Sequence, residues 1–176
     1  MTDSKRLTHA KGLYLEGIRD GNMQAALDKH VGDRYTQHST GVRDGKEGFL
    51  EFFAPFLERN PIRDIQVVRA IEDGNHVFCQ VYQSLNNGEA QWVTADLFDT
   101  DEEGRLIEHW DVIAEYTWPT ASGRSMVDGP TEIEDLDKTD ANKAVVQGFV
   151  DDVLIGGQGN DALSGGSGDD TYYFES

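Results

Sequence analysis

Hydrophobic residues near the start of the chain recur at the spacing of α-helices. The spacing predicts two helical pieces within residues 7–30, separated at Gly21 and Asn22, of which Asn22 can cap the second piece. A third helix is expected over residues 46–58. The hydrophobic positions that define these helices are Leu13, Tyr14, Ile18, Met23, Ala26, Leu27, Phe49, Leu50, Phe53, Phe56 and Leu57.

Further along the chain, hydrophobic and polar residues alternate as they do in β-strands. Strands are expected over residues 65–71, 76–85, 91–98 and 106–118. Turn sequences rich in Asn, Asp and Gly separate them, and a short extended stretch over 34–38 precedes the third helix. Helices followed by a meander of long strands predict an α+β fold, in which a cone-shaped, curved antiparallel sheet wraps on the N-terminal helices.

The composition changes after residue 118. We expect a cone domain over 1–118, an acidic linker over 119–139, a helix over 140–155 and a repeat tail over 156–176. The linker contains Pro, Gly, Ser, Thr and many acidic residues, with few large apolar side chains. The helix and the repeat therefore form an appendage to the cone domain.

The tail contains two copies of a nine-residue pattern. Residues 156–164 and 165–173 both fit Gly-Gly-x-Gly-x-Asp-x-U-x, where U is a large apolar residue. This pattern resembles the RTX repeats of calcium-binding β-roll proteins, and by that resemblance Asp152, Asp161 and Asp170 are candidate calcium ligands. The alternative is a glycine- and aspartate-rich tail that holds no ion.

The charge of the chain narrows the range of partners. The formal net charge is −18, from 33 acidic and 15 basic residues. Such a surface repels phosphate backbones and anionic lipids, so nucleic acid and membrane partners are not expected. The single cysteine, Cys79, cannot form an intramolecular disulfide, and the residues after Met1 lack the apolar run of a secretory signal, so no such signal is expected. These features favour a cytoplasmic protein, with export by a C-terminal signal as the alternative.

Alternation along two expected strands brings ionisable side chains onto one face. Asp96, His109 and Asp111 share this face if the turn between the strands centres between Glu102 and Glu103. The register then places Asp96 opposite His109, Phe98 opposite Ile107 and Thr94 opposite Asp111. Three ionisable groups among apolar neighbours are typical of a functional pocket rather than of plain packing.

Four motifs together resemble a known family. They are Tyr-x-Gln-His from Tyr35, Asp-Gly-Lys-Glu-Gly-Phe from Asp44, Asp-x-Phe from Asp96, and Gly-x-Leu-Ile-Glu-His-Trp-Asp from Gly104. The sequence is similar to the SnoaL-like family of the nuclear-transport-factor-two superfamily, whose cyclases close polyketide rings by intramolecular aldol chemistry. The resemblance implies a cone with one pocket, a homodimer, no cofactor in the cone domain, and a pocket aspartate that acts as acid and base. By motif that aspartate is Asp111.

The expected roles follow from the chemistry of aldol closure. A base must remove a proton next to a carbonyl, and donors must stabilise the enolate oxygen. We assign Asp111 as the base, His38 and His109 as proton donors or orienting groups, and Asp96 as the partner of a histidine. Gln37 is set aside because alternation places it on the face opposite His38. The expected pocket residues are Tyr35, Phe53, Trp92, Thr94 and Phe98.

The sequence leaves several functions open. The first is a lyase or isomerase that acts without a cofactor on a small apolar carbonyl compound, by aldol, isomerase or dehydratase chemistry. The second is a domain that binds a small ligand without transforming it and carries a calcium-responsive tail. A third interpretation uses the same two histidines and two aspartates as ligands for zinc or iron.

Overall fold

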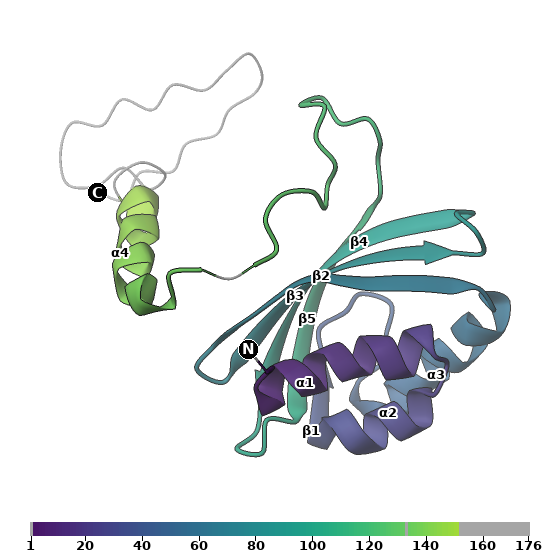
Figure 1. The fold of residues 1–176 in the computed structure, drawn as a ribbon. Helices are drawn as coiled ribbons and strands as arrows, with labels where there is room; N and C mark the ends of the chain where they lie inside the picture. Colours follow the sequence, from purple (N-terminus) through teal and green to yellow (C-terminus); the bar gives the residue numbers. More distant parts are fainter. Residues whose placement is uncertain (1, 133, 152–176) are drawn as a thin grey trace, which may run out of the picture. The chain divides into compact units, whose positions relative to one another are not determined.

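The computed structural model describes residues 2–132 and 134–151 (Figure 1). The chain divides into two compact units, Met1–Thr131 and Glu132–Ser176. The first unit holds the helices and the sheet, and the second holds a further helix. The candidate calcium ligands Asp152, Asp161 and Asp170 lie outside the described residues.

The helices of the first unit form where the hydrophobic spacing places them. Ser4 begins the first helix because its hydroxyl accepts a hydrogen bond from the Leu7 backbone N–H at 3.1 Å. The predicted break falls at Gly21, whose φ of +80° is a left-handed conformation that favours glycine. The elements are α1 (Lys5–Gly12), the π-helical η1 (Leu13–Arg19), α2 (Met23–His30) and α3 (Gly45–Arg59).

A sheet of five strands lies against these helices, which cover one of its faces (Figure 1). The strands are β1 (Val31–Gln37), β2 (Arg63–Asp73), β3 (His76–Leu85), β4 (Ala90–Thr100) and β5 (Leu106–Glu115), in the order β1-β5-β4-β3-β2. The predicted meander of β2 to β5 is confirmed. The sheet is mixed rather than wholly antiparallel, because β1 pairs with β5 in parallel. Helix α3 and three strands intervene between them, and this length of chain permits a parallel pairing.

The register between β4 and β5 differs from the predicted one by two residues. Asp96 lies opposite Asp111, and Phe98 lies opposite His109. One residue of the difference arises because the turn is centred on Glu103, and the second arises from a β-bulge between Asp99 and Thr100. Either change alone would turn the side chains to the other face, but together they restore the predicted face.

The bulge also changes which residue of β5 enters the core. Leu106 pairs with Thr100 and is completely buried, whereas Ile107 is left without a partner in the ladder. Ile107 therefore does not share the inner face with His109, as the uninterrupted alternation predicted. The inner face beyond the bulge consists of His109, Asp111 and Ile113, as expected.

The core between the helices and the sheet is tightly packed. Its most deeply buried large side chains are Leu13, Leu27, Val31, Val77, Phe98 and Leu106. Cys79 is also completely buried, and burial raises the pKa of its thiol to about 12. This thiol stays protonated at neutral pH, which agrees with the predicted role in packing rather than in nucleophilic chemistry.

The segment after β5 belongs to the first unit up to Thr131. Arg69 of β2 donates hydrogen bonds to the backbone carbonyls of Pro130 at 3.0 Å and Asp128 at 2.6 Å. Gln80 of β3 donates to the carbonyl of Met126 at 3.2 Å. These contacts hold residues 119–131 as a strap beside the sheet, so the compact unit extends beyond residue 118.

The second unit contains the 3₁₀ turn η2 (Leu136–Lys138) and α4 (Thr139–Phe149). Helix α4 was expected from Asp140, and its hydrophobic residues Val145, Val146 and Phe149 are exposed. Across the described parts of both units, no helix has the length and apolar character needed to cross a bilayer.

Candidate active site

A cavity of about 180 Å³ lies between the inner face of the sheet and the helices. Its apolar walls come mainly from α3 and η1 and include Phe49, Phe52, Phe53 and Ile18. Its polar wall comes from β4 and β5 and carries Asp96, His109 and Asp111. The structure therefore brings together the three ionisable residues that strand alternation predicted.

Asp96 is the most firmly held group in the cavity. Its side chain is 1% exposed and accepts hydrogen bonds from Tyr14 Oη at 2.5 Å and from Thr94 Oγ1 at 2.6 Å. His109 Nε2 lies 3.1 Å from the same carboxylate. Three side chains thus contact one buried carboxylate, so Asp96 is suited to orienting its neighbours.

Tyr14 reaches this carboxylate from η1 and was not among the predicted site residues. Burial, together with the nearby charge of Asp96, raises the pKa of the Tyr14 hydroxyl well above its usual value. The hydroxyl therefore remains protonated and donates to Asp96 at neutral pH. No local sequence signal identifies Tyr14, because it meets Asp96 across 82 positions of the chain.

His109 is fixed at both ring nitrogens. Nε2 faces Asp96, Nδ1 lies 3.0 Å from Gln37 Oε1, and the ring stacks on Phe98 with centroids 4.6 Å apart. The imidazolium form donates from both nitrogens in this arrangement. The neutral form keeps its Nε2 proton toward Asp96 and accepts from Gln37 when that amide is turned. Either way, Asp96 and Gln37 set the orientation of the ring.

Asp111 is the carboxylate best placed for chemistry. It is half-buried, lines the cavity and accepts a hydrogen bond at Oδ2 from Ser39 Oγ at 2.8 Å. Among the described residues, Ser39 is its one hydrogen-bond donor, so Oδ1 faces no protein donor. Asp96 lies opposite it across the strand pair. One aspartate is thus held by three donors, and the other keeps an oxygen available to a ligand.

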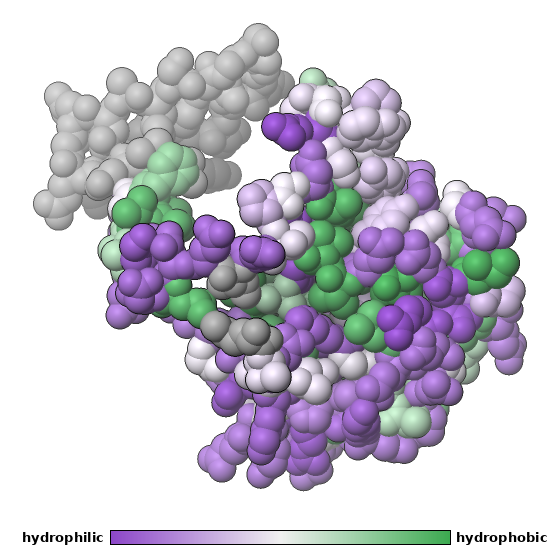
Figure 2. Space-filling view, in the orientation of Figure 1, coloured by the Kyte–Doolittle hydropathy of each residue, from purple (hydrophilic) through white to green (hydrophobic). Residues whose placement is uncertain are grey.

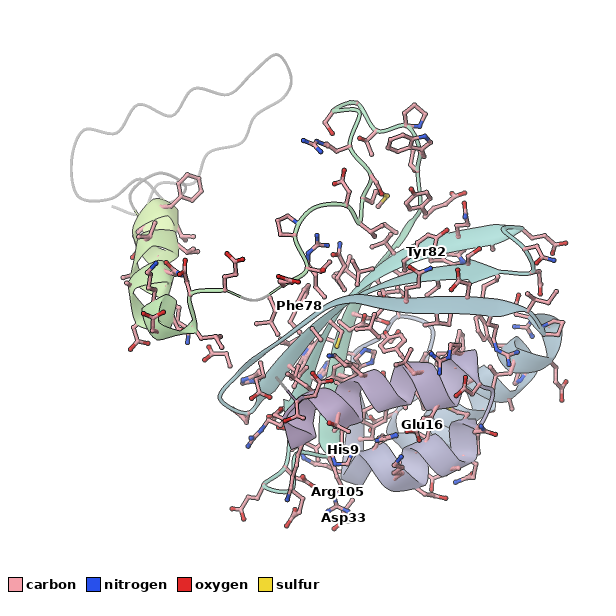
Figure 3. The ribbon with its side chains drawn as sticks, in the orientation of Figure 1. His9, Glu16, Asp33, Phe78, Tyr82 and Arg105 are labelled. Atoms are coloured by element: carbon pink, nitrogen blue, oxygen red, sulfur yellow. The ribbon has the colours of Figure 1, made fainter. Side chains whose placement is uncertain are left out.

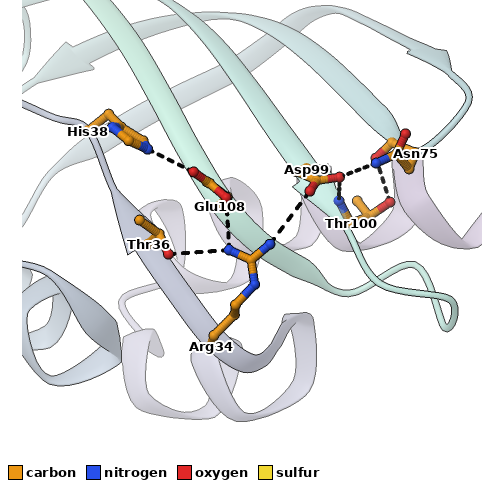
Figure 4. Close-up of polar contacts among 7 residues, drawn as sticks. All are labelled: Arg34, Thr36, His38, Asn75, Asp99, Thr100 and Glu108. Atoms are coloured by element: carbon orange, nitrogen blue, oxygen red, sulfur yellow. Dashed lines mark hydrogen bonds and ion pairs between the residues drawn. The ribbon is translucent and has the colours of Figure 1, made fainter.

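His38 lies away from this cavity, contrary to its predicted place among the catalytic residues. Its Nε2 is 2.9 Å from Glu108 Oε1 (Figure 4). Its ring stacks on Trp110 with centroids 4.8 Å apart. Arg34 binds the same Glu108 at 2.8 Å, and the hydrogen bonds from Arg34 and His38 lower the pKa of that carboxyl. These residues form a polar network on the outer face of the sheet.

Gln37, rather than His38, is the residue of this part of the chain that reaches the site. Gln37 and His38 point to opposite faces, and the structure places Gln37 at the site, against His109. The parallel pairing of β1 with β5 aligns Gln37 with His109. That pairing joins distant parts of the chain, so local alternation does not decide which of the two faces meets the site.

Four of the five predicted pocket residues line the cavity. Tyr35, Phe53, Thr94 and Phe98 do so, whereas Trp92 does not. Trp92 shares the strand face of Thr94, but the cavity ends at Thr94 and the Trp92 side chain is 37% exposed. Alternation identifies the face of a residue, but it does not show how far the helices extend along the strand.

The same polar wall has the composition of a metal site. One ligand atom each from Asp96, His109 and Asp111 lies within 4.8 Å of the others. Two carboxylates and one imidazole suit several divalent metals. Asp96 already accepts three hydrogen bonds from side chains, so a metal would have to displace some of these donors. The observed contacts thus fit an acid and base site more simply than a metal site.

The fold and the pocket define an α+β protein of the nuclear-transport-factor-two type. A model of the SnoaL-like domain family matches residues 13–109, and the chain belongs to this family. A model of the RTX calcium-binding nonapeptide repeat matches residues 148–176. No curated protein matches the chain.

Solved structures with the same fold support this placement. A proposed polyketide cyclase from Bacillus cereus ATCC 10987 is 15% identical with a TM-score of 0.55, covering 62% of this chain and 74% of its own. A second proposed polyketide cyclase, from Acidithiobacillus ferrooxidans, is 18% identical with a TM-score of 0.55. The match covers 64% of this chain and 90% of the cyclase. An LEH-like epoxide hydrolase from M. tuberculosis is 17% identical with a TM-score of 0.51. The match covers 62% of this chain and 83% of the hydrolase. These similarities establish the fold.

Proposed function

We propose that this protein is an acid and base enzyme that acts, without a cofactor in the first unit, on a small apolar carbonyl compound. The observation that carries the proposal is the contrast between Asp96 and Asp111. Asp96 is held by three donors, whereas Asp111 lines the cavity with one oxygen that faces no protein donor. A half-buried carboxylate in an apolar cavity is an effective base toward a weak carbon acid.

The reaction follows from the positions of these groups. Asp111 removes a proton from the carbon next to the carbonyl, and the electron pair of that C–H bond forms the enolate. In an aldol closure the enolate carbon bonds to a second carbonyl carbon, and the new alkoxide takes a proton. Asp111, now protonated, lines the cavity and returns that proton to the alkoxide. Isomerase chemistry uses the same first step and returns the proton to a different carbon.

The experiment that tests this function measures the first step alone. A base that forms an enolate exchanges the protons next to the carbonyl with solvent, even when no ring closes. We therefore use 2-indanone, a small uncharged ketone whose CH₂ groups flank the carbonyl, and follow its deuteration in D₂O by ¹H NMR. A ligand-binding domain without chemistry would bind the ketone and leave its exchange rate unchanged.

The RTX match supports a second property, calcium binding by the C-terminal repeat. Titration of the full chain with CaCl₂ is expected to give a saturable heat of binding in calorimetry. Deletion of residues 152–176 is expected to abolish that heat, because this deletion removes both repeat units and the candidate ligands Asp152, Asp161 and Asp170. MgCl₂ at the same concentration is the control. An equal calcium heat after the deletion would place the site elsewhere.

We also propose that the first unit forms a homodimer through the outer face of its sheet. Ile71, Phe78, Leu97 and Trp110 are successive cross-strand neighbours on four strands. Phe78 and Tyr82 lie on the side of the sheet away from the helices (Figure 3), and hydrophobic side chains are exposed over this unit (Figure 2). An exposed apolar row with charged residues around it is typical of a protein interface.

The dimer is tested by placing a charge in this row. Leu97, which is 39% exposed, is replaced by lysine, and the mass in solution is measured by light scattering after size exclusion. The wild type is expected to have the mass of two chains and Leu97→Lys the mass of one, because a lysine ammonium would be buried unpaired in the interface. The matched control is Ile62→Lys, an exposed apolar position outside the row. A wild-type monomer would contradict the proposal.

A further inference from the structure

The charge of the cavity wall limits what can enter it. The described residues that line the cavity include two carboxylates, Asp96 and Asp111, and no lysine or arginine. His109 can neutralise the charge of one carboxylate at most, because its Nε2 is paired with Asp96 Oδ1 at 3.1 Å. An anionic ligand would therefore meet the unpaired charge of Asp111 in a partly dry cavity, where like charges repel strongly.

The volume of the cavity sets a second limit on the ligand. The cavity measures about 180 Å³. Pockets for drug-sized ligands measure about 300–1,000 Å³. This cavity thus suits a compound of one or two small rings. Phe49, Phe52 and Phe53 of α3 provide flat apolar walls for such a ring.

Tyr35 supplies a buried hydroxyl to the cavity wall. Its side chain is 3% exposed, and its hydroxyl has no hydrogen-bond partner among the described residues. The Gln37 amide is near enough to affect this hydroxyl, but the two groups do not meet in hydrogen-bond geometry. Burial raises the pKa of Tyr35, so the hydroxyl keeps its proton and is available as a donor. A buried hydroxyl without a partner is costly and calls for one in the functional complex.

The other buried donors of the wall already have acceptors within the protein. Tyr14 and Thr94 donate to Asp96, His109 contacts Asp96 and Gln37, and Ser39 donates to Asp111. Away from solvent, the O–H of Tyr35 and the free oxygen of Asp111 are the positions of this wall without a partner. Thr40 also lines the cavity but is exposed, and Gln37 Nε2, which lacks a partner, lies behind the wall against His109. Two neighbouring rings hold the ring of Tyr35 in place. It lies edge-on to Phe49, with ring centroids 5.5 Å apart, and it stacks with His109, with ring centroids 6.3 Å apart.

We propose that Tyr35 is a catalytic residue that donates a hydrogen bond to the carbonyl oxygen of the ligand, and that the cavity selects uncharged carbonyl compounds over carboxylates. This inference rests on the proposed function. The ligand offers one acceptor to Tyr35 and one acidic C–H bond to Asp111. When Asp111 takes the proton, the electron pair of that bond moves onto the carbonyl oxygen, and the Tyr35 hydroxyl stabilises the resulting enolate.

The selectivity is tested with two probes that contain the same number of non-hydrogen atoms. The first is 2-indanone, which is uncharged, and the second is phenylacetate, which is a carboxylate. Binding to the full chain is measured by titration in ¹H–¹⁵N correlation spectra. The ketone is expected to bind at least about tenfold more tightly, because phenylacetate brings a second negative charge beside Asp111. Binding of phenylacetate within threefold of the ketone, or no ketone binding at millimolar concentration, would overturn the proposal.

The role of Tyr35 is tested by Tyr35→Phe, which removes only the hydroxyl oxygen. Deuterium exchange into 2-indanone is expected to slow by about 10²–10³-fold, the usual effect of removing one donor to an oxyanion. Glu108→Gln, on the outer face of β5, is the control and is expected to leave exchange within twofold of the wild-type rate. A Tyr35→Phe rate that is also within twofold of the wild-type rate would show that the hydroxyl is not a donor to the enolate, and the proposal would be wrong. The correlation spectrum of each variant confirms that the fold is retained.

The two proposals can fail separately. If Asp111→Asn leaves exchange unchanged, the proposed base is wrong whatever Tyr35 does. If exchange requires Asp111 but proceeds normally in Tyr35→Phe, the function stands and the inference about Tyr35 fails. Asp111→Asn also removes the repelling charge, so phenylacetate is expected to bind this variant more tightly than it binds the wild type. No gain in phenylacetate affinity would contradict the charge argument.

Discussion

Asp111→Asn is expected to reduce enolate formation by about 10²–10⁴-fold, the range in which general bases contribute. The substitution keeps the shape of the side chain, and the amide oxygen can still accept the hydrogen bond from Ser39. It removes the negative charge and basicity that proton abstraction requires. The readout is the rate of deuterium exchange into 2-indanone, and the thermal stability of the variant is expected to change little.

The chain offers a matched control for this substitution. Glu108 lies three positions earlier on the same strand, and its carboxylate binds Arg34 and His38 on the outer face. Glu108→Gln therefore removes a carboxylate from β5 without touching the cavity, and exchange is expected to stay within twofold of the wild-type rate. His38→Ala is expected to have the same small effect. A large loss in either variant would place the chemistry on the outer face.

Asp96→Ala is expected to have the largest effect on stability. The substitution leaves the Tyr14 hydroxyl, the Thr94 hydroxyl and a His109 nitrogen buried without their shared acceptor. Removing one partner from a buried charged network costs about 3–5 kcal/mol. For a unit of this size, that loss corresponds to a melting temperature lower by roughly 10–20 °C. Calorimetry of the wild type and the variant measures it.

An exposed carboxylate provides the comparison for Asp96. Glu51 pairs with Arg43, and their side chains are 64% and 80% exposed. Surface pairs of this kind contribute about 0–1 kcal/mol, so Glu51→Ala is expected to leave the melting temperature almost unchanged. If Asp96→Ala destabilised the protein no more than Glu51→Ala does, the three hydrogen bonds would not be holding the site together.

The sequence predicts the architecture because helices and strands are encoded by local spacing. The three helical segments, the meander of β2 to β5 and the shared face of Asp96, His109 and Asp111 all follow from residues close together in the chain. The register was predicted incorrectly because it depends on a turn centre and on a bulge at Asp99. Neither has a marked signal in the residues of that hairpin.

The composition of the site depends on contacts that no local pattern encodes. Gln37 reaches His109 only because β1 joins the sheet beside β5, and Tyr14 reaches Asp96 from a helix. Both residues look like ordinary strand and helix positions in the sequence. The sequence therefore identifies the ionisable residues of the cavity wall, whereas the structure shows which neighbours hydrogen-bond to each of them.

The most direct test of the account is the deuteration of 2-indanone in D₂O, followed by ¹H NMR with wild-type protein, with Asp111→Asn and without protein. We expect the signal of the CH₂ groups to disappear much faster with wild-type protein than in the other two samples. Equal rates in all three samples would contradict the central claim that Asp111 forms an enolate in this cavity. Equal acceleration by both proteins would show that another group is the base.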